Sequence, residues 1–175
     1  MSKHAGASRK GKAAEQLIAA ISVLATGGEL NALTALVDDE GVDLSFKRRN
    51  GTRTLDVQVK ARFSDDAGSK ALREKSQFTS VVREQTFRPR DDLYILFVAI
   101  NGPRGAVETA WLVPSRDFGD VGMRVRINGQ PGIKFVASAK ATSQDKWRTY
   151  RLGPDEWPAR LLAVAEGLEG ARGNR

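Results

Sequence analysis

The sequence predicts an α/β domain in which a mixed β-sheet is flanked by helices, with extra strands and a helix at the C-terminal end. Three observations lead to this prediction. Apolar residues near the N-terminus recur with the 3.6-residue period of an amphipathic helix. Two alternating segments then flank an Asn-Gly pair, as in a β-hairpin. Residues 93–100 form an unbroken apolar run, which is typical of a central strand covered on both faces.

The length of 175 residues suits one domain with a core of its own. We expect residues 1–8 to be a disordered basic tail. Residues 9–169 are expected to form a single domain, with its core over 9–100 and a C-terminal elaboration over 101–169, and residues 170–175 are expected to fray. The predicted order within the core is helix, three strands, helix, strand.

The first helix is expected from about Arg9 to Ala25, where Gly27 and Gly28 end it. A strand over 29–37 and a turn over 38–41 follow. Lys70 to Gln85 is predicted to form one helix or two short ones, with Leu72, Phe78, Val81 and Val82 facing inward. After the central strand we expect an antiparallel strand at 107–113, a helical turn at 114–115, short strands at 123–127, 133–138 and near 147–152, and a helix opening at Pro154.

The hairpin covers Val42 to Lys60. If Asn50 and Gly51 form a two-residue type I′ turn, opposed residues have numbers that sum to 101, and Asp43 lies across from Gln58. Because side chains alternate along a strand, one face is apolar and the other carries Asp43, Gln58 and Lys60. Directly opposed side chains have Cβ atoms about 4.5–5.5 Å apart. An acid, an amide and a lysine are therefore predicted to lie within reach of one another.

The residue inventory excludes several kinds of chemistry. The chain has no cysteine, which rules out disulfides, a cysteine nucleophile and cysteine-ligated metals. His4 is the single histidine and lies in the expected tail, which argues against histidine-based catalysis or zinc sites. No apolar run approaches the ~18–20 residues of a membrane span, and the N-terminus lacks the apolar segment of a secretory signal. We expect a cytoplasmic protein with no membrane partner and no small organic cofactor.

Positive charge is concentrated around the hairpin. Between Ser45 and Arg90 there are twelve Lys or Arg and five Asp or Glu, an excess of seven that equals the net charge of +7 of the whole chain. A basic surface of this kind favours a polyanionic partner. The candidates for phosphate contacts are Lys47, Arg48, Arg49, Arg53 and Arg62, and the weaker ones are Arg73, Lys75, Arg83, Arg88 and Arg90.

The polar face of the hairpin suits a hard metal ion. Mg²⁺ is held by a few carboxylate and carbonyl oxygens and keeps several of its waters. Such an ion activates water and offsets the charge that develops when a phosphodiester is cleaved. Asp43 and Gln58 supply two oxygens, and Lys60 supplies an ammonium that can orient or deprotonate the water. Val59 separates Gln58 from Lys60, so strand alternation places those two on one face.

These residues resemble the PD-(D/E)XK nuclease superfamily, which has the restriction-endonuclease-like fold. The matching stretches are Gly11-Lys-Ala-Ala-Glu15, Gly41-Val-Asp43-Leu44 and Gln58-Val-Lys60, within residues 9–100. The resemblance implies a core order αβββαβ, a metal held by Asp43 and Gln58, and Glu15 from the helix pointing into the same site. From the helical period alone, Glu15 falls at the border of the apolar stripe.

The sequence departs from the family pattern at Gln58, where Asp or Glu is usual. Its carbonyl oxygen can still bind a metal, Glu15 would supply a second carboxylate, and Asp56 is a further candidate acid on the same face. With fewer anionic ligands we expect one weakly held Mg²⁺ or Mn²⁺.

The resemblance implies a metal-dependent endodeoxyribonuclease of restriction, defence, recombination or repair. The alternatives are a catalytically silent DNA-binding protein of the same fold, a Holliday-junction-like resolvase, and a regulatory or structural protein whose basic surface meets an acidic protein. RNA as the substrate and a homodimer are left open.

Overall fold

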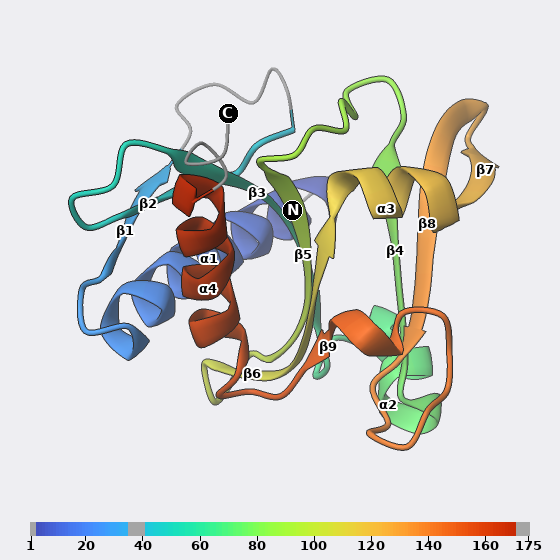
Figure 1. Cartoon of the computed structure of the whole chain (residues 1–175). Helices are drawn as coiled ribbons and strands as arrows, with labels where there is room; N and C mark the ends of the chain where they lie inside the picture. The colour runs from blue at the N-terminus through green and yellow to red at the C-terminus, as the bar shows by residue number, and fades with distance from the viewer. Residues whose placement is uncertain (1–2, 35–40, 171–175) are drawn as a thin grey trace.

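The computed structural model describes residues 3–34 and 41–170, with side chains from residue 9 onward (Figure 1). Its main sheet has six strands in the order β1-β2-β3-β5-β6-β9. These strands are β1 (Leu30–Thr34), β2 (Leu44–Arg48), β3 (Thr54–Phe63), β5 (Leu93–Asn101), β6 (Ala106–Pro114) and β9 (Arg151–Leu152). The strand β3 is parallel to β5, and the other pairings are antiparallel, so the sheet is mixed as predicted.

A second sheet of three strands has the order β4-β8-β7. Its strands are β4 (Gln77–Arg83), β7 (Met123–Ile127) and β8 (Gln130–Ser138), and the helices of the chain are α1 (Lys3–Ala25), α2 (Lys70–Lys75), α3 (Ser115–Val121) and α4 (Trp157–Gly170). Short 3₁₀ turns lie at Ala67–Ser69 and Arg148–Tyr150.

The main sheet separates two hydrophobic clusters. On one face α1 and α4 pack against it through residues such as Ile18, Val57 and Leu161, all fully buried. On the other face the three-stranded sheet and α3 enclose an aromatic cluster, in which the rings of Phe97 and Phe135 stack with centroids 3.7 Å apart. Figure 1 shows α1 and α4 on one side of β5 and the strands β4 and β8 on the other. The predicted α/β class, with a mixed sheet flanked by helices, is confirmed.

The predicted helix over Lys70 to Gln85 is wrong for its second half. The helix α2 has six residues and ends where Ser76 adopts a left-handed φ of 54°. The strand β4 follows, with Phe78, Ser80 and Val82 buried in alternation. The period of two is weak in the sequence, because the buried position 80 is a serine and the outward position 81 is a valine. The observed core therefore has a strand between α2 and β5 that the order αβββαβ lacks.

The first helix is longer than expected at its N-terminus. It begins at Lys3, six residues before the predicted start at about Arg9. Once a helix is nucleated, each further residue adds a backbone hydrogen bond at little cost, and Ala5 and Ala7 favour such an extension. The expected turn over 38–41 and the frayed end over 170–175 fall mostly outside the described residues. In the described part of the chain, no helix is long and apolar enough to cross a membrane.

The hairpin between β2 and β3 keeps the predicted register but not the predicted turn. Leu44 pairs with Val57 and Lys47 with Thr54, so the paired numbers sum to 101. The connection is not a two-residue turn, because the strands stop at Arg48 and Thr54.

The reason lies in α4, whose Glu169 carboxylate accepts hydrogen bonds from the backbone N–H groups of Thr52 and Arg53, both at 2.7 Å. These two amides therefore donate to α4 and not to the opposite strand of the hairpin. The bond from the Arg53 amide, with those from Thr52, lowers the pKa of Glu169.

Candidate metal site on strand β3

The polar face of β3 opens into a cleft of about 670 Å³ between β3 and β4. Gln58, Lys60 and Arg62 line this cleft from β3, as the alternation of the strand predicts. The opposite wall comes from β4 and the segment after it, and its residues are Ser80, Val81, Arg83 and Thr86. We refer to this space as the β3–β4 cleft. It brings two of the predicted site residues, Gln58 and Lys60, together with Arg62 and Arg83.

Asp43 reaches β3 in a different way from the one predicted. The β2–β3 ladder ends at Leu44 and Val57, and the Asp43 amide donates to the Val57 carbonyl at 3.0 Å. Asp43 is therefore not paired directly across from Gln58. Its carboxylate Oδ2 instead accepts a hydrogen bond of 2.6 Å from the backbone N–H of Val59. This bond fixes the acid at the residue between Gln58 and Lys60.

Gln58 is held close to the chain that leads into β2. Its side chain is buried, with 8% of its surface exposed. Gly41 has a left-handed φ of 69°, and a Cβ at this position would lie 2.7 Å from the Gln58 amide nitrogen. Only a residue without a side chain permits this approach without displacing the amide. The glycine of the Gly-Val-Asp stretch thus has a physical role beside the site.

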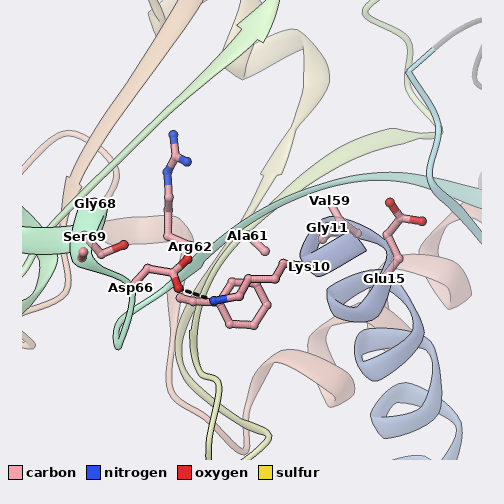
Figure 2. A pocket seen from close by; sticks show the side chains of 11 residues that line it. Lys10, Gly11, Glu15, Val59, Ala61, Arg62, Asp66, Gly68 and Ser69 are labelled. Atoms are coloured by element: carbon pink, nitrogen blue, oxygen red, sulfur yellow. Dashed lines mark hydrogen bonds and ion pairs between the residues drawn. The ribbon is translucent and has the colours of Figure 1, made fainter. Parts of the chain in front are cut away.

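Glu15 lies on α1 and lines a second pocket of about 540 Å³. This pocket and the β3–β4 cleft share Gly11, Val59, Ala61 and Arg62, so the two spaces adjoin along the same stretch of β3. The Glu15 carboxylate is 16% exposed and forms an ion pair of 2.7 Å with Lys12. In Figure 2 the carboxylate points away from the Lys10–Asp66 pair at the other end of the pocket. Glu15 thus lines a pocket together with Val59, the residue whose amide donates to the Asp43 carboxylate.

Lys10 and Asp66 close the far end of the Glu15 pocket. The Lys10 ammonium donates to the Asp66 carboxylate and lies 5.2 Å from the centre of the Phe63 ring. The hydrogen bond to Asp66 raises the pKa of Lys10, so the ammonium stays charged. This pair joins the start of α1 to the loop after β3. Sequence reasoning did not predict it, because residues 10 and 66 belong to no common motif.

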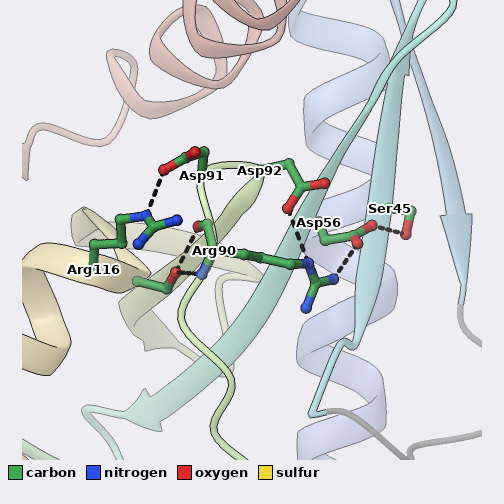
Figure 3. A network of polar contacts seen from close by, with 7 residues as sticks. Ser45, Asp56, Arg90, Asp91, Asp92 and Arg116 are labelled. Carbon is green, nitrogen blue, oxygen red and sulfur yellow. Dashed lines mark hydrogen bonds and ion pairs between the residues drawn. The ribbon is translucent and has the colours of Figure 1, made fainter.

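Asp56 is already occupied by a structural network (Figure 3). Its carboxylate accepts a hydrogen bond from the Ser45 hydroxyl and forms an ion pair with Arg90, which also pairs with Asp92 at 2.9 Å. The Asp56 amide donates to the Asp92 carbonyl at 2.8 Å. These contacts tie the start of β3 to the segment before β5. A carboxylate held between a serine and an arginine is a poor candidate for the extra metal ligand that the sequence suggested.

The predicted phosphate-contacting residues separate into two groups. Arg62 lines the β3–β4 cleft, and its Nε donates to the Thr79 carbonyl at 3.0 Å. Arg53 donates to the Leu168 carbonyl, and Arg48 lies 3.7 Å from Glu166, so both contact α4. Arg49 lies in the hairpin loop and Lys47 on β2, also toward the hairpin end. At about 3.3 Å per residue, Arg53 lies roughly 23 Å from Lys60 along β3.

Three of the predicted site residues carry the kind of oxygen donors that a single magnesium ion takes. Among the described residues, no group of three or more His, Cys, Asp or Glu side chains could hold a metal. Asp43, Glu15 and the Gln58 amide offer two carboxylates and one neutral oxygen. A carboxylate that accepts one backbone hydrogen bond still has lone pairs for a cation. Mg²⁺ is often bound by one or two carboxylates, with water and substrate phosphate completing its shell.

Arg83 and Thr86, which form part of the opposite wall of the cleft, were not among the leading candidates from the sequence. Arg83 is among the weaker candidates for phosphate contacts, and Thr86 is not among the candidates. The alternation of Phe78, Ser80 and Val82 is the signal that could have placed Arg83 at the end of a strand.

No family model matches the chain, and no curated protein matches it. Among solved structures, the chain is similar to one described as a bacterial homing endonuclease, I-Ssp6803I, with 20% identity and a TM-score of 0.49. The likeness covers 87% of this chain and 93% of that chain.

Proposed function

We propose that the protein is a metal-dependent endodeoxyribonuclease. The observation that carries the proposal is the convergence of three groups on one stretch of β3. Gln58 and Lys60 face the β3–β4 cleft, and the Asp43 carboxylate is bonded to the backbone of the residue between them. An amide oxygen and an ammonium in the cleft, with an acid bonded to the backbone of the residue between them, form a site suited to phosphodiester hydrolysis.

Each residue has a distinct role in this proposal. Asp43 and Gln58 would hold Mg²⁺ or Mn²⁺, and Glu15 would complete the ligand set or bind its water shell. The ion, when bound, supplies an acidified water and neutralises charge on the phosphate. Lys60 orients the attacking water and stabilises the negative charge that develops on the phosphoryl oxygens. Arg62 and Arg83 contact the flanking phosphates, which positions the strand without reading its sequence.

DNA is the substrate class that the charge favours. The net charge of +7 and the three basic side chains Lys60, Arg62 and Arg83 in the cleft suit a polyanionic chain. Binding of this kind weakens steeply with salt, because phosphate contacts release condensed counterions.

The test is nicking of supercoiled plasmid, with single-stranded and four-way-branched DNA as parallel substrates. We expect plasmid nicking in Mg²⁺ or Mn²⁺ and none in EDTA, because the proposed water is activated only by the ion. Preferential cleavage of the branched substrate would favour the resolvase alternative. If none of the three substrates is cleaved in Mg²⁺ or in Mn²⁺, the proposed activity is contradicted.

A silent DNA-binding protein is the second candidate, and Gln58 favours it. The amide leaves the site one negative charge short of the usual motif, which weakens its hold on a cation. This alternative predicts salt-sensitive binding of duplex DNA with no nicking in Mg²⁺ or Mn²⁺.

A further inference from the structure

The hairpin formed by β7 and β8 stands out as an exposed basic ribbon outside the metal site. From Val121 to Gln144 the sequence contains four Lys or Arg and no Asp or Glu. The strand β7 is the edge of its sheet, and its side chains are exposed except for Val125, which is half-buried. Met123 and Ile127 keep 50% and 46% of their surface exposed. The ribbon thus combines a positive charge with two exposed apolar side chains.

The tip of this ribbon is a tight turn that presents two amide side chains. Ile127 pairs with Gln130, so Asn128 and Gly129 form the whole connection. Their φ angles of 50° and 80° are those of a type I′ turn, which suits the twist of a hairpin. Asn128 and Gln130 are both exposed. Asn and Gln side chains can bond bidentately to adenine in the major groove, and apolar groups such as Ile127 can contact the methyl group of thymine.

The ribbon is continuous with the β3–β4 cleft. A groove of about 500 Å³ beside the ribbon is lined by Ile127, Asn128, Gln130, Val81 and Arg83, among others. Val81 and Arg83 also line the β3–β4 cleft. One surface therefore leads from Lys60 along β4 to the tip of the ribbon. If the backbone of a DNA duplex lies in the cleft, one of the grooves of that duplex faces the ribbon.

We propose that the β7–β8 ribbon enters the major groove of duplex DNA and reads its base pairs through Asn128 and Gln130. The major groove admits a two-stranded ribbon of this kind. The inference rests on the proposed function for its substrate and extends it to sequence preference. The exposed edge of β7 has five residues, or about 17 Å at about 3.3 Å each, which spans roughly five base pairs at 3.4 Å.

A second copy of the chain fits this edge less well. If β7 paired antiparallel with its counterpart around Val125, Arg124 of one chain would lie opposite Arg126 of the other. Like charges placed directly across a ladder are destabilising. The charge of the ribbon thus favours a polyanion over self-association. Arg124 itself is partly neutralised by an ion pair of 2.9 Å with Glu84, whereas Arg126 donates a hydrogen bond to the Gly129 carbonyl.

The test is selection from a pool of duplexes with a randomised centre, performed in EDTA so that binding is measured without cleavage. The ribbon variant combines Asn128→Gly, which keeps the left-handed turn, with Gln130→Ala. The matched control is Gln144→Ala, an exposed amide in the loop after the other end of β8. Wild type and control are expected to enrich the same run of about five base pairs. The ribbon variant is expected to lose that enrichment and to bind the selected duplex at least about tenfold more weakly, with unrelated duplex bound as before.

Methylation protection on the selected duplex identifies the groove. Protection of N7 is expected at guanines that lie within or directly beside the enriched run, since that atom faces the major groove. Protection confined to the minor groove, unchanged selection by the ribbon variant, or no enriched positions for the wild type would each overturn the inference. A change in oligomeric state of the ribbon variant without a change in DNA selection would assign the ribbon to self-association instead. Because these readouts need no cleavage, their failure is distinguishable from a failure of the nicking assay.

Discussion

Replacing Lys60 by methionine is expected to lower the rate of Mg²⁺-dependent plasmid nicking by about 10²- to 10⁴-fold while leaving DNA binding nearly unchanged. Methionine keeps the length and the apolar stem of the side chain but removes the ammonium. In the proposed site that ammonium orients the water and stabilises charge that exists only in the transition state. Groups of this kind contribute factors of about 10² to 10⁴ to rate. The measurement is the initial rate of nicking at saturating protein, beside binding to the same plasmid.

The matched control for Lys60 is Arg104→Ala, which removes one positive charge from the β5–β6 turn outside both site pockets. Its nicking rate is expected to stay close to that of the wild type. Thermal unfolding of both variants verifies that the fold is kept. Nicking by the Lys60 variant at the rate of the control would refute the assignment of this lysine. An equal loss in both variants would mean that net charge, and not the position of Lys60, controls the rate.

Replacing Gln58 by glutamate is expected to strengthen metal binding and to reduce the Mg²⁺ concentration needed for half-maximal nicking. Glutamate is nearly isosteric with glutamine and restores the carboxylate that the resemblance leads us to expect. Additional anionic ligands tighten cation binding at oxygen sites. Gln58→Ala, which removes the ligand, is the matched control and is expected to require more Mg²⁺ than the wild type.

The effect of Gln58→Glu on the unfolding temperature gives a test that does not depend on cleavage. Position 58 is only 8% exposed, so a carboxylate there is costly to ionise unless a cation accompanies it. Without metal, Gln58→Glu should therefore unfold at a lower temperature than the wild type. A ligand at 100 times its Kd stabilises a protein by about 2.7 kcal/mol, so Mg²⁺ should raise the unfolding temperature of Gln58→Glu more than that of the wild type. Equal responses of the wild type, Gln58→Glu and Gln58→Ala to Mg²⁺ would show that residue 58 is not a ligand.

The faces of the β2–β3 hairpin could be predicted because they depend only on the alternation of side chains. Leu44, Phe46, Leu55 and Val57 are fully buried, while Lys60 and Arg62 line the cleft. The turn could not be predicted in the same way. Glu169 accepts the Thr52 and Arg53 amides from 116 or more residues away in the sequence. A local Asn-Gly signal gives no information about such a distant acceptor.

The opposite wall of the cleft could not be predicted, because the alternation of apolar residues in this segment is weak and its strand structure depends on tertiary packing. The sequence predicts a helix over residues 77–83, which contain a buried serine, whereas the structure has β4 there, packed into the aromatic cluster. Asp43 also departs from its predicted position, because the strand pairing ends one residue earlier and the carboxylate bonds to Val59. The residue types at the site were predictable from the sequence. Their spatial relation depended on where the strands diverge.

The central claim is that Asp43 and Gln58 bind a divalent cation beside Lys60. Anomalous X-ray diffraction from crystals soaked in Mn²⁺ tests it most directly, because the ion is located by its own scattering. The expected result is an anomalous peak within about 2.0–2.3 Å of an Asp43 carboxylate oxygen and the Gln58 amide oxygen, comparable with ligand distances of hard divalent ions. Crystals of Asp43→Ala should lack that peak. A peak at other residues, or none at this position in the wild type, would contradict the account.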